Sequence, residues 1–190
     1  MKRVIPNVLA AACLTFCMAS AAPAQEAVVT GLWRQVDPDT GRTGAWFLFF
    51  ERGGVFEGAI AKTFPPPGEE PNKRCTQCEG AQKNAPMLGL VIIKGMRRQG
   101  LEYENGSIMD PRSGSVYNAV MHLSPDGRTL VVRGYLGISL FGKDQTWYRL
   151  PDSNYAQLDP SVKAAHPMPG HPAGAPRPAP RSAAGAPAGH

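Results

Sequence analysis

Residues 116–135 read VYNAVMHLSPDGRTLVVRGY and have the pattern of a β-hairpin. Tyr117, Ala119, Met121 and Leu123 are apolar and occupy every second position, whereas the polar residues Asn118 and His122 fall between them. This period of two gives an extended strand one apolar face and one polar face. The letters SPDG at 124–127 then cluster residues that favour a tight turn, and a second β-branched run follows. The stretch therefore predicts two antiparallel strands joined by a turn.

Short β-branched or aromatic runs separated by turns continue on both sides of this hairpin. Turn signals occur at 37–41 (DPDTG), 52–54 (RGG), 104–106 (ENG) and 110–114 (DPRSG). No long segment has the spacing of an amphipathic helix. The chain is therefore predicted to be all-β, as an antiparallel sandwich or barrel. The predicted strands are Val28–Val36, Ala45–Glu51, Val55–Lys62, Gly89–Met96, Leu101–Tyr103, Ser107–Met109, Val116–Ser124, Thr129–Tyr135 and Gln145–Leu150.

The N-terminal residues have the three parts of a signal peptide. A basic start at Lys2-Arg3 precedes an apolar run over Val8–Ala22, and residues 22–24 (APA) match the small-x-small cleavage pattern. The run is shorter than the ~20 residues that a membrane span requires. We predict a signal peptide over residues 1–24; cleavage two residues earlier and a lipoprotein cut at Cys13 are the alternatives. The protein is therefore expected to be periplasmic or secreted, with no transmembrane segment after cleavage.

The composition changes after Leu150. Of the 30 residues from Ser161 to His190, 20 are Ala, Pro or Gly. Such a segment buries too little apolar surface to offset the entropy of ordering it. We therefore predict a β-domain over residues 27–151 and a disordered Pro/Ala-rich tail over residues 152–190, and we expect the tail to add nothing to the stability of the fold.

The charge of the predicted domain argues against one class of partner. Between Glu26 and Leu150 the chain has 15 basic and 13 acidic residues. This near balance creates no strong positive field for a polyanion. No nucleic acid is therefore expected as a partner.

Two cysteines follow the predicted cleavage site, in the long irregular stretch Phe64–Pro86. Cys75 and Cys78 have the C-x-x-C spacing, but Glu79 stands where a c-type haem site requires histidine. A structural zinc site needs four ligands, and His122 is the domain's only histidine. An exported protein favours a disulfide that fixes the long loop. Thiol redox chemistry is the alternative.

The sequence contains none of the common hydrolase or nucleotide-binding motifs: no G-x-S-x-G, no H-E-x-x-H and no phosphate-binding glycine loop. A lone His122 on a strand is interpreted as an ordinary surface or packed residue. We therefore predict a non-catalytic protein with no cofactor and no metal.

One glycine-rich segment is unusual. Residues 133–142 (RGYLGISLFG) place three glycines among large apolar residues just before the last predicted strand. Glycine at such a position permits a sharp bend or a close backbone approach. The segment is interpreted either as a packed barrel corner or as a rim that contacts a ligand. In the second case the candidate ligand-binding residues are Arg133, Tyr135, Gln145 and Trp147.

Short stretches along the chain form a recognisable series. They are GLW at 31–33, CTQCEG at 75–80, KNAPMLG at 83–89, GSIMDP at 106–111, GSVY at 114–117, LVVRGYLG at 130–137, LFG at 140–142 and QTW at 145–147. In this order they resemble an exported bacterial family, domain of unknown function 2147. Lys143-Asp144 departs from the pattern, where a more basic, hydroxylated pair is expected. The resemblance implies export and the general form of the domain, but no activity.

A second resemblance concerns architecture. Gly31-x-Trp33 on the first predicted strand, with an arginine on a late strand, is similar to the barrel-closing signature of lipocalins and related calycins. In those proteins the tryptophan packs across one barrel end beneath the arginine, a part that Arg149 or Arg133 would play here. The resemblance implies a small antiparallel β-barrel of about eight strands with Trp33 and Arg149 as a structural plug.

The function expected from these features is that of an exported, non-catalytic envelope protein that binds a small or apolar ligand inside a β-barrel. Two alternatives stay open. One is a periplasmic protein–protein interaction module with a filled barrel and another envelope protein as its partner. The other is a thiol redox protein that uses Cys75 and Cys78.

Overall fold

The computed structural model describes residues 26–70 and 73–168. The predicted signal peptide and the predicted tail beyond Met168 lie outside the described residues.

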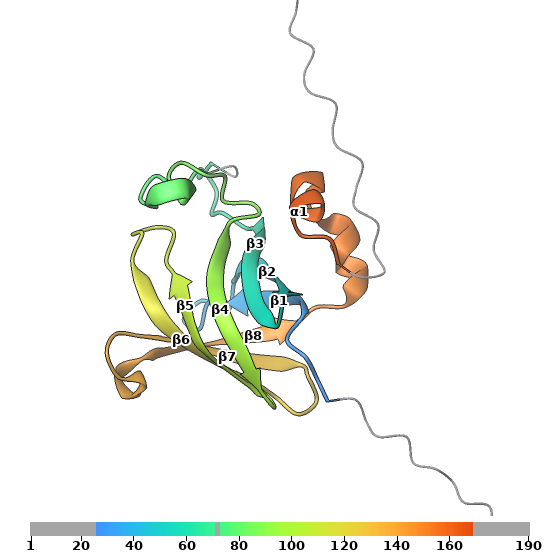
Figure 1. Ribbon diagram of the computed structural model, residues 1–190. Helices are drawn as coiled ribbons and strands as arrows, with labels where there is room; N and C mark the ends of the chain where they lie inside the picture. The colour runs from blue at the N-terminus through green and yellow to red at the C-terminus, as the bar shows by residue number, and fades with distance from the viewer. Residues whose placement is uncertain (1–25, 71–72, 169–190) are drawn as a thin grey trace, which may run out of the picture.

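Antiparallel strands close into a barrel in which each strand pairs with the next and β8 pairs with β1 (Figure 1). The all-β barrel predicted from the sequence is confirmed. Closure gives every strand a hydrogen-bonded neighbour on both sides. The eight strands are β1 (Gly31–Val36), β2 (Thr43–Arg52), β3 (Val55–Thr63), β4 (Val91–Gln99), β5 (Glu102–Met109), β6 (Val116–Leu123), β7 (Thr129–Tyr135) and β8 (Lys143–Arg149), with short 3-10 helices at η1 (Gly80–Gln82) and η2 (Ser139–Phe141).

Strand β5 contains an irregularity where the sequence predicted a turn. Asn105 has a φ of 62°, and the register of β5 with β6 shifts between Tyr103 and Gly106. A bulge of this kind bends a strand without ending it. A side chain at Gly106 would collide with Sδ of Met96 on β4. The turn predicted at 104–106 is therefore wrong, and the two short strands predicted around it are one.

The barrel interior is filled by side chains that contact one another. Every strand contributes inward residues to this cluster. Its largest members are aromatic: Trp33, Phe49, Tyr103 and Trp147 are each at most 1% exposed. The interior is therefore a hydrophobic core along most of its length.

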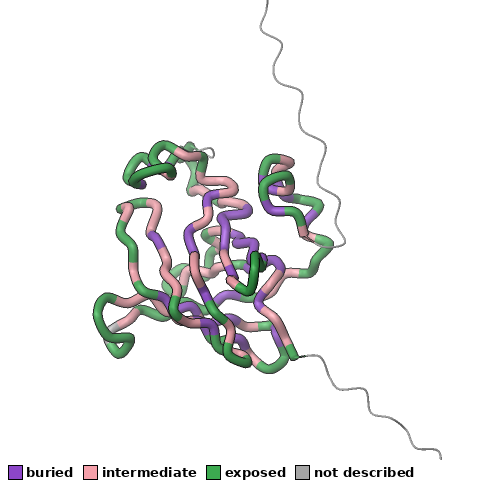
Figure 2. Tube along the Cα trace, in the orientation of Figure 1, coloured by how far each residue is buried: buried purple, intermediate pink, exposed green. Residues whose placement is uncertain are grey.

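A second core lies outside the barrel, between strands β1–β3 and residues 152–168, which we call the C-terminal strap (Figure 1). The strap consists of η3 (Asp152–Gln157) and α1 (Pro160–Ala165), and Asp159 caps α1 by accepting a hydrogen bond from the Ser161 amide. Figure 2 shows buried segments both within the strap and in the strands nearest to it. This outer core consists of Leu32, Trp46, Leu48, Phe50, Ala59, Ala61, Tyr155, Leu158 and Val162.

The strap corrects the predicted boundary between domain and tail. Tyr155, Leu158 and Val162 are at most 3% exposed. The prediction that residues from 152 onward form a disordered tail outside the domain is therefore wrong for residues 152–168. The Ala, Pro and Gly content of residues 161–190 favoured disorder, but three apolar side chains on one face of residues 152–168 are enough to dock a short segment.

Candidate functional site

One end of the barrel is closed by Trp33 and Arg149, which are register partners on β1 and β8. The Arg149 guanidinium lies 4.4 Å from the centre of the Trp33 ring and donates to the Thr30 carbonyl at 2.8 Å. Indole Nε1 of Trp33 donates to the Val29 carbonyl at 2.7 Å. Gly31 has a φ of 119°, which L side chains rarely adopt, and a Cβ there would lie 2.9 Å from Nη1 of Arg149; both favour the glycine of the Gly-x-Trp pair.

This closed end holds polar groups in a nonpolar environment. Burial lowers the pKa of Arg149, and burial raises the pKa of Tyr103, whose hydroxyl accepts a hydrogen bond from the Val29 amide at 2.9 Å. Further carbonyl oxygens, of Val28 and Gly127, accept hydrogen bonds from Arg149. The arginine therefore holds the N-terminal segment across the barrel end.

At the opposite end the inward positions keep contact with solvent. Gln35, for example, is two residues after buried Trp33 on the same face of β1 and is half-buried, and Gln145, two residues before buried Trp147 on β8, is exposed. The barrel is thus sealed at one end and accessible at the other. The inward residues that keep this exposure, which we call the open rim, are Gln35, Ala45, Ile108, Tyr117, Gly134 and Gln145.

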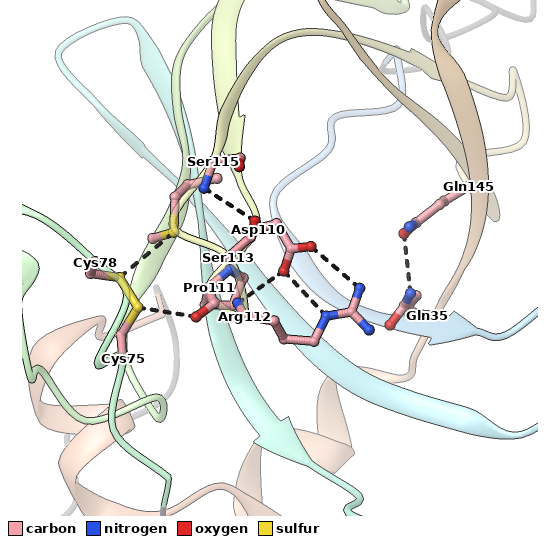
Figure 3. Close-up of polar contacts among 10 residues, drawn as sticks. Gln35, Cys75, Cys78, Asp110, Pro111, Arg112, Ser113, Ser115 and Gln145 are labelled. Atoms are coloured by element: carbon pink, nitrogen blue, oxygen red, sulfur yellow. Dashed lines mark hydrogen bonds and ion pairs between the residues drawn. A yellow bond between two sulfur atoms is a disulfide. The ribbon is translucent and has the colours of Figure 1, made fainter.

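The open rim has an apolar wall and one polar centre. Nε2 of Gln35 donates to Oε1 of Gln145 at 3.1 Å, as Figure 3 shows, and Nε1 of Trp147 donates to the same oxygen at 3.2 Å. The Trp147 ring stacks on Phe47 with ring centres 4.2 Å apart. A few fixed polar groups against apolar and aromatic surface are typical of sites for small ligands that are largely apolar.

The structure does not bring the four predicted ligand-binding residues together. Gln145 and Trp147 face inward, whereas Arg133 and Tyr135 lie on the outer face of β7, on the alternate positions from buried Val132. Arg133 pairs with both carboxylate oxygens of Asp144, at 2.5 and 2.7 Å. Adjacent strand residues point to opposite faces, so a segment read as one rim divides between the two sides of the wall.

The long loop between β3 and β4 docks beside the open rim and contains a disulfide between Cys75 and Cys78. Sγ of Cys75 lies 3.3 Å from the Pro111 carbonyl oxygen, as Figure 3 shows. Sγ of Cys78 lies 3.7 Å from Sδ of Met109. A Cβ on Gly114 would collide with the Gln77 carbonyl, so the loop packs directly on the backbone of the β5–β6 turn.

The predicted disulfide is confirmed, and its burial bears on the redox alternative. Cys75 is 0% and Cys78 is 4% exposed. Thiol–disulfide exchange requires a thiolate to reach one of the two sulfur atoms. The buried position favours a structural disulfide that fixes the local shape of the loop where it packs on the barrel.

Residues 31–149 match the model of a family described as uncharacterized proteins conserved in bacteria, DUF2147. The chain belongs to this family. A search of curated proteins found no match. Among solved structures, the chain is similar to protein HP1028 from Helicobacter pylori, described as belonging to the lipocalin family. The TM-score is 0.60 at 19% identity, over 70% of this chain and 91% of that one, so the similarity shows the lipocalin-like fold alone.

The described residues also form hollows on the outside of the barrel. A groove of about 860 Å³ runs between the disulfide loop, β3, β4 and the strap, and Arg74, Leu88 and Lys94 are among its lining residues. A smaller hollow of about 260 Å³ lies on the outer wall beside His122 and Arg133. Within residues 26–70 and 73–168 no cluster of three metal-ligating side chains occurs, and no helix is long and apolar enough to cross a membrane.

The sequence did not lead us to predict Gln35 as a residue of the open rim. The available signal was its position two residues after Trp33, which places both on one face of a strand. Its pairing with Gln145 depends on the β1–β8 closure, in which Gln35 lies opposite Trp147. That pairing is set by the register of the whole barrel and not by any local pattern.

Proposed function

We propose that this protein is an exported, non-catalytic binding protein that takes a small, largely apolar ligand at the open rim of its barrel. One observation carries this proposal: inward positions are sealed beneath Arg149 at one end but stay exposed around Gln35 and Gln145 at the other. The ligand would contact the apolar wall and exchange a hydrogen bond with the glutamine pair. Because the core below the rim is filled, the ligand would sit at the rim and not deep inside the barrel.

Export is part of the same proposal. Its support is the signal-peptide pattern of residues 1–24 and the Cys75–Cys78 disulfide. Disulfides persist in oxidising compartments such as the periplasm. A periplasmic or secreted location follows.

A pair of adjacent substitutions tests the ligand site. Gln145→Phe places a bulky ring at the inward rim and removes the polar centre, whereas Thr146→Phe places the same ring on the outer face of the same strand. With the uncharged dye N-phenyl-1-naphthylamine as the probe, we expect Gln145→Phe to weaken binding by at least about tenfold, or ~1.4 kcal/mol. Thr146→Phe should bind like the parent. Equal affinities in the two variants would contradict a site at the rim.

A second candidate function is a protein–protein interaction module, which the loop between β7 and β8 favours. Leu136, Ile138 and Leu140 are 68%, 60% and 75% exposed. Arg133 holds this loop in place through Asp144 and the Ser139 carbonyl, which it reaches at 3.3 Å. Exposed apolar side chains gathered on one segment commonly mark interaction sites.

The same dye experiment separates the two candidates. Replacing Leu136, Ile138 and Leu140 together with serine should leave dye binding at the rim unchanged. If the loop serves a partner, this variant loses a cross-link to an envelope protein that Gln145→Phe retains.

A further inference from the structure

His166 joins the C-terminal strap to the barrel wall. It follows α1 and is 5% exposed. Its ring stacks on Phe50 of β2 with ring centres 4.6 Å apart and planes within 13°. The hydroxyl of Tyr155, another strap residue, donates to the His166 carbonyl at 3.3 Å. The His166 ring is therefore buried between the strap and the barrel wall, and its contacts help to hold the strap in place.

The two ring nitrogens of His166 have partners that fit one protonation state. Nε2 lies 2.9 Å from the Gly89 carbonyl oxygen, which can only accept, so Nε2 carries the hydrogen. Nδ1 lies 3.3 Å from Nη2 of Arg52, which can only donate, so Nδ1 must offer its lone pair. The neutral imidazole with hydrogen on Nε2 satisfies both contacts. A protonated ring would direct a second N–H, and a positive charge, at the guanidinium.

We propose that the C-terminal strap is an acid-sensitive latch, held on the barrel by neutral His166 and loosened when this ring is protonated. The guanidinium that opposes the proton makes further contacts, including an ion pair with Glu57 at 3.5 Å. Nη2 of Arg52 also donates to the Ala165 carbonyl at 3.3 Å. The Cζ atom of Arg52 lies 4.6 Å from the centre of the Phe50 ring. Arg52 thus contacts the end of the strap at the Ala165 carbonyl and at Nδ1 of His166, and protonation of the ring would turn the second contact into a repulsive one.

The charges around His166 set the direction of the effect. Burial is the largest effect, and it lowers the pKa of His166 from the ordinary value of 6.5. Arg52 of β2 lowers this pKa further, whereas the hydrogen bond to Gly89 and the charge of Glu57 on β3 raise it. The net result is a lowered pKa. The segment 87–90, which supplies the Gly89 carbonyl, has no charged side chain. On the strap itself, Asp159 and Lys163 lie within α1 or at its cap.

A lowered pKa in the docked state makes docking weaker in acid. Above pH ~6.5 the ring is neutral whether the strap is docked or free, so the full stability of docking is present. As the pH falls below that value, the free strap takes up the proton first. Each further pH unit then favours release by up to about tenfold, until the docked ring is protonated as well.

Release would uncover apolar surface on the outside of the barrel. Leu32, Trp46 and Leu48 are at most 8% exposed with the strap in place, and they form the outer core with it. The latch therefore controls access to a hydrophobic face on the wall of strands β1–β3, separate from the open rim.

Hydrogen exchange of the full chain at pH 7.5, 6.5 and 5.5 tests the latch, with labelling times scaled for the intrinsic pH dependence of exchange. The reporters are amides of the strap, such as that of His166, which donates to the Val162 carbonyl at 2.9 Å. We expect their protection to fall by up to about tenfold between pH 6.5 and 5.5 while the barrel strands stay protected. Unchanged strap protection across this range would overturn the proposal.

Two variants assign the effect to one ring. His166→Gln keeps a neutral side chain that can donate to Gly89 and accept from Arg52, so its strap protection should not depend on pH. His122→Gln, a change at an exposed histidine of β6, should behave like the parent. A pH response that survives in His166→Gln would place the switch elsewhere and refute the latch.

A direct titration covers the case in which His166→Gln does not hold the strap at any pH. The ring proton signals of His166 in the unsubstituted chain should titrate below pH 6.5, together with the loss of strap protection. A midpoint at or above 6.5 with the strap still docked would refute the proposal.

Discussion

Replacing Trp33 with alanine should lower the free energy of unfolding by about 3–5 kcal/mol. The side chain is 0% exposed and lies beneath the Arg149 guanidinium. Its removal leaves a cavity at the closed end and deprives the arginine of its aromatic partner. This loss is a large fraction of the ~5–15 kcal/mol that stabilises a typical domain. Denaturant unfolding followed by circular dichroism measures it.

Tyr148→Ala is the matched control, because Tyr148 is an aromatic residue next to Arg149 but is 42% exposed on the outer face. We expect this change to cost about 1 kcal/mol or less, as exposed positions generally do. A Trp33→Ala protein as stable as the Tyr148→Ala protein would contradict the role of Trp33 as the barrel plug.

Ending the chain after Pro151 should lower the free energy of unfolding by about 2–4 kcal/mol, since three buried side chains leave and part of the gain is offset by the ordering entropy of the strap. The lost side chains are Tyr155, Leu158 and Val162. For a domain of this size the thermal midpoint should fall by roughly 10 °C. Calorimetry at pH 7.5, where the strap is docked, measures the shift.

Ending the chain after Met168 is the control for this truncation. That chain keeps every strap contact described above, and the residues removed are rich in Pro and Ala. We expect its thermal midpoint to match that of the full chain. A truncation after Pro151 that melts like the full chain would show that the strap does not stabilise the barrel.

The barrel was predictable because alternation is a local signal. The stretch 116–135 forms β6 and β7 with the SPDG turn between them, as its pattern predicts. The turn predicted at 104–106 is a bulge in β5, because an Asn-Gly pair with Asn105 at positive φ suits a bulge as well as a turn. The strap was missed because it has few apolar residues and docks on a surface that exists only once the barrel has closed.

The candidate site was predictable only in part. Gly31, Trp33 and Arg149 form one structural unit across the closed end, in keeping with their motif. The open rim depends on which inward positions reach solvent, and that depends on the stagger of all strands around the barrel. No local pattern contains this information, so Gln35 was missed and Arg133 was assigned to the wrong face.

Native mass spectrometry of the protein isolated from its own bacterium tests the central proposal most directly. We predict a fraction of molecules that carry one small, noncovalent ligand in the parent protein and in Thr146→Phe, and none in Gln145→Phe. Recovery of only the bare polypeptide from all three, or a ligand that stays bound in Gln145→Phe, would contradict a ligand site at the open rim.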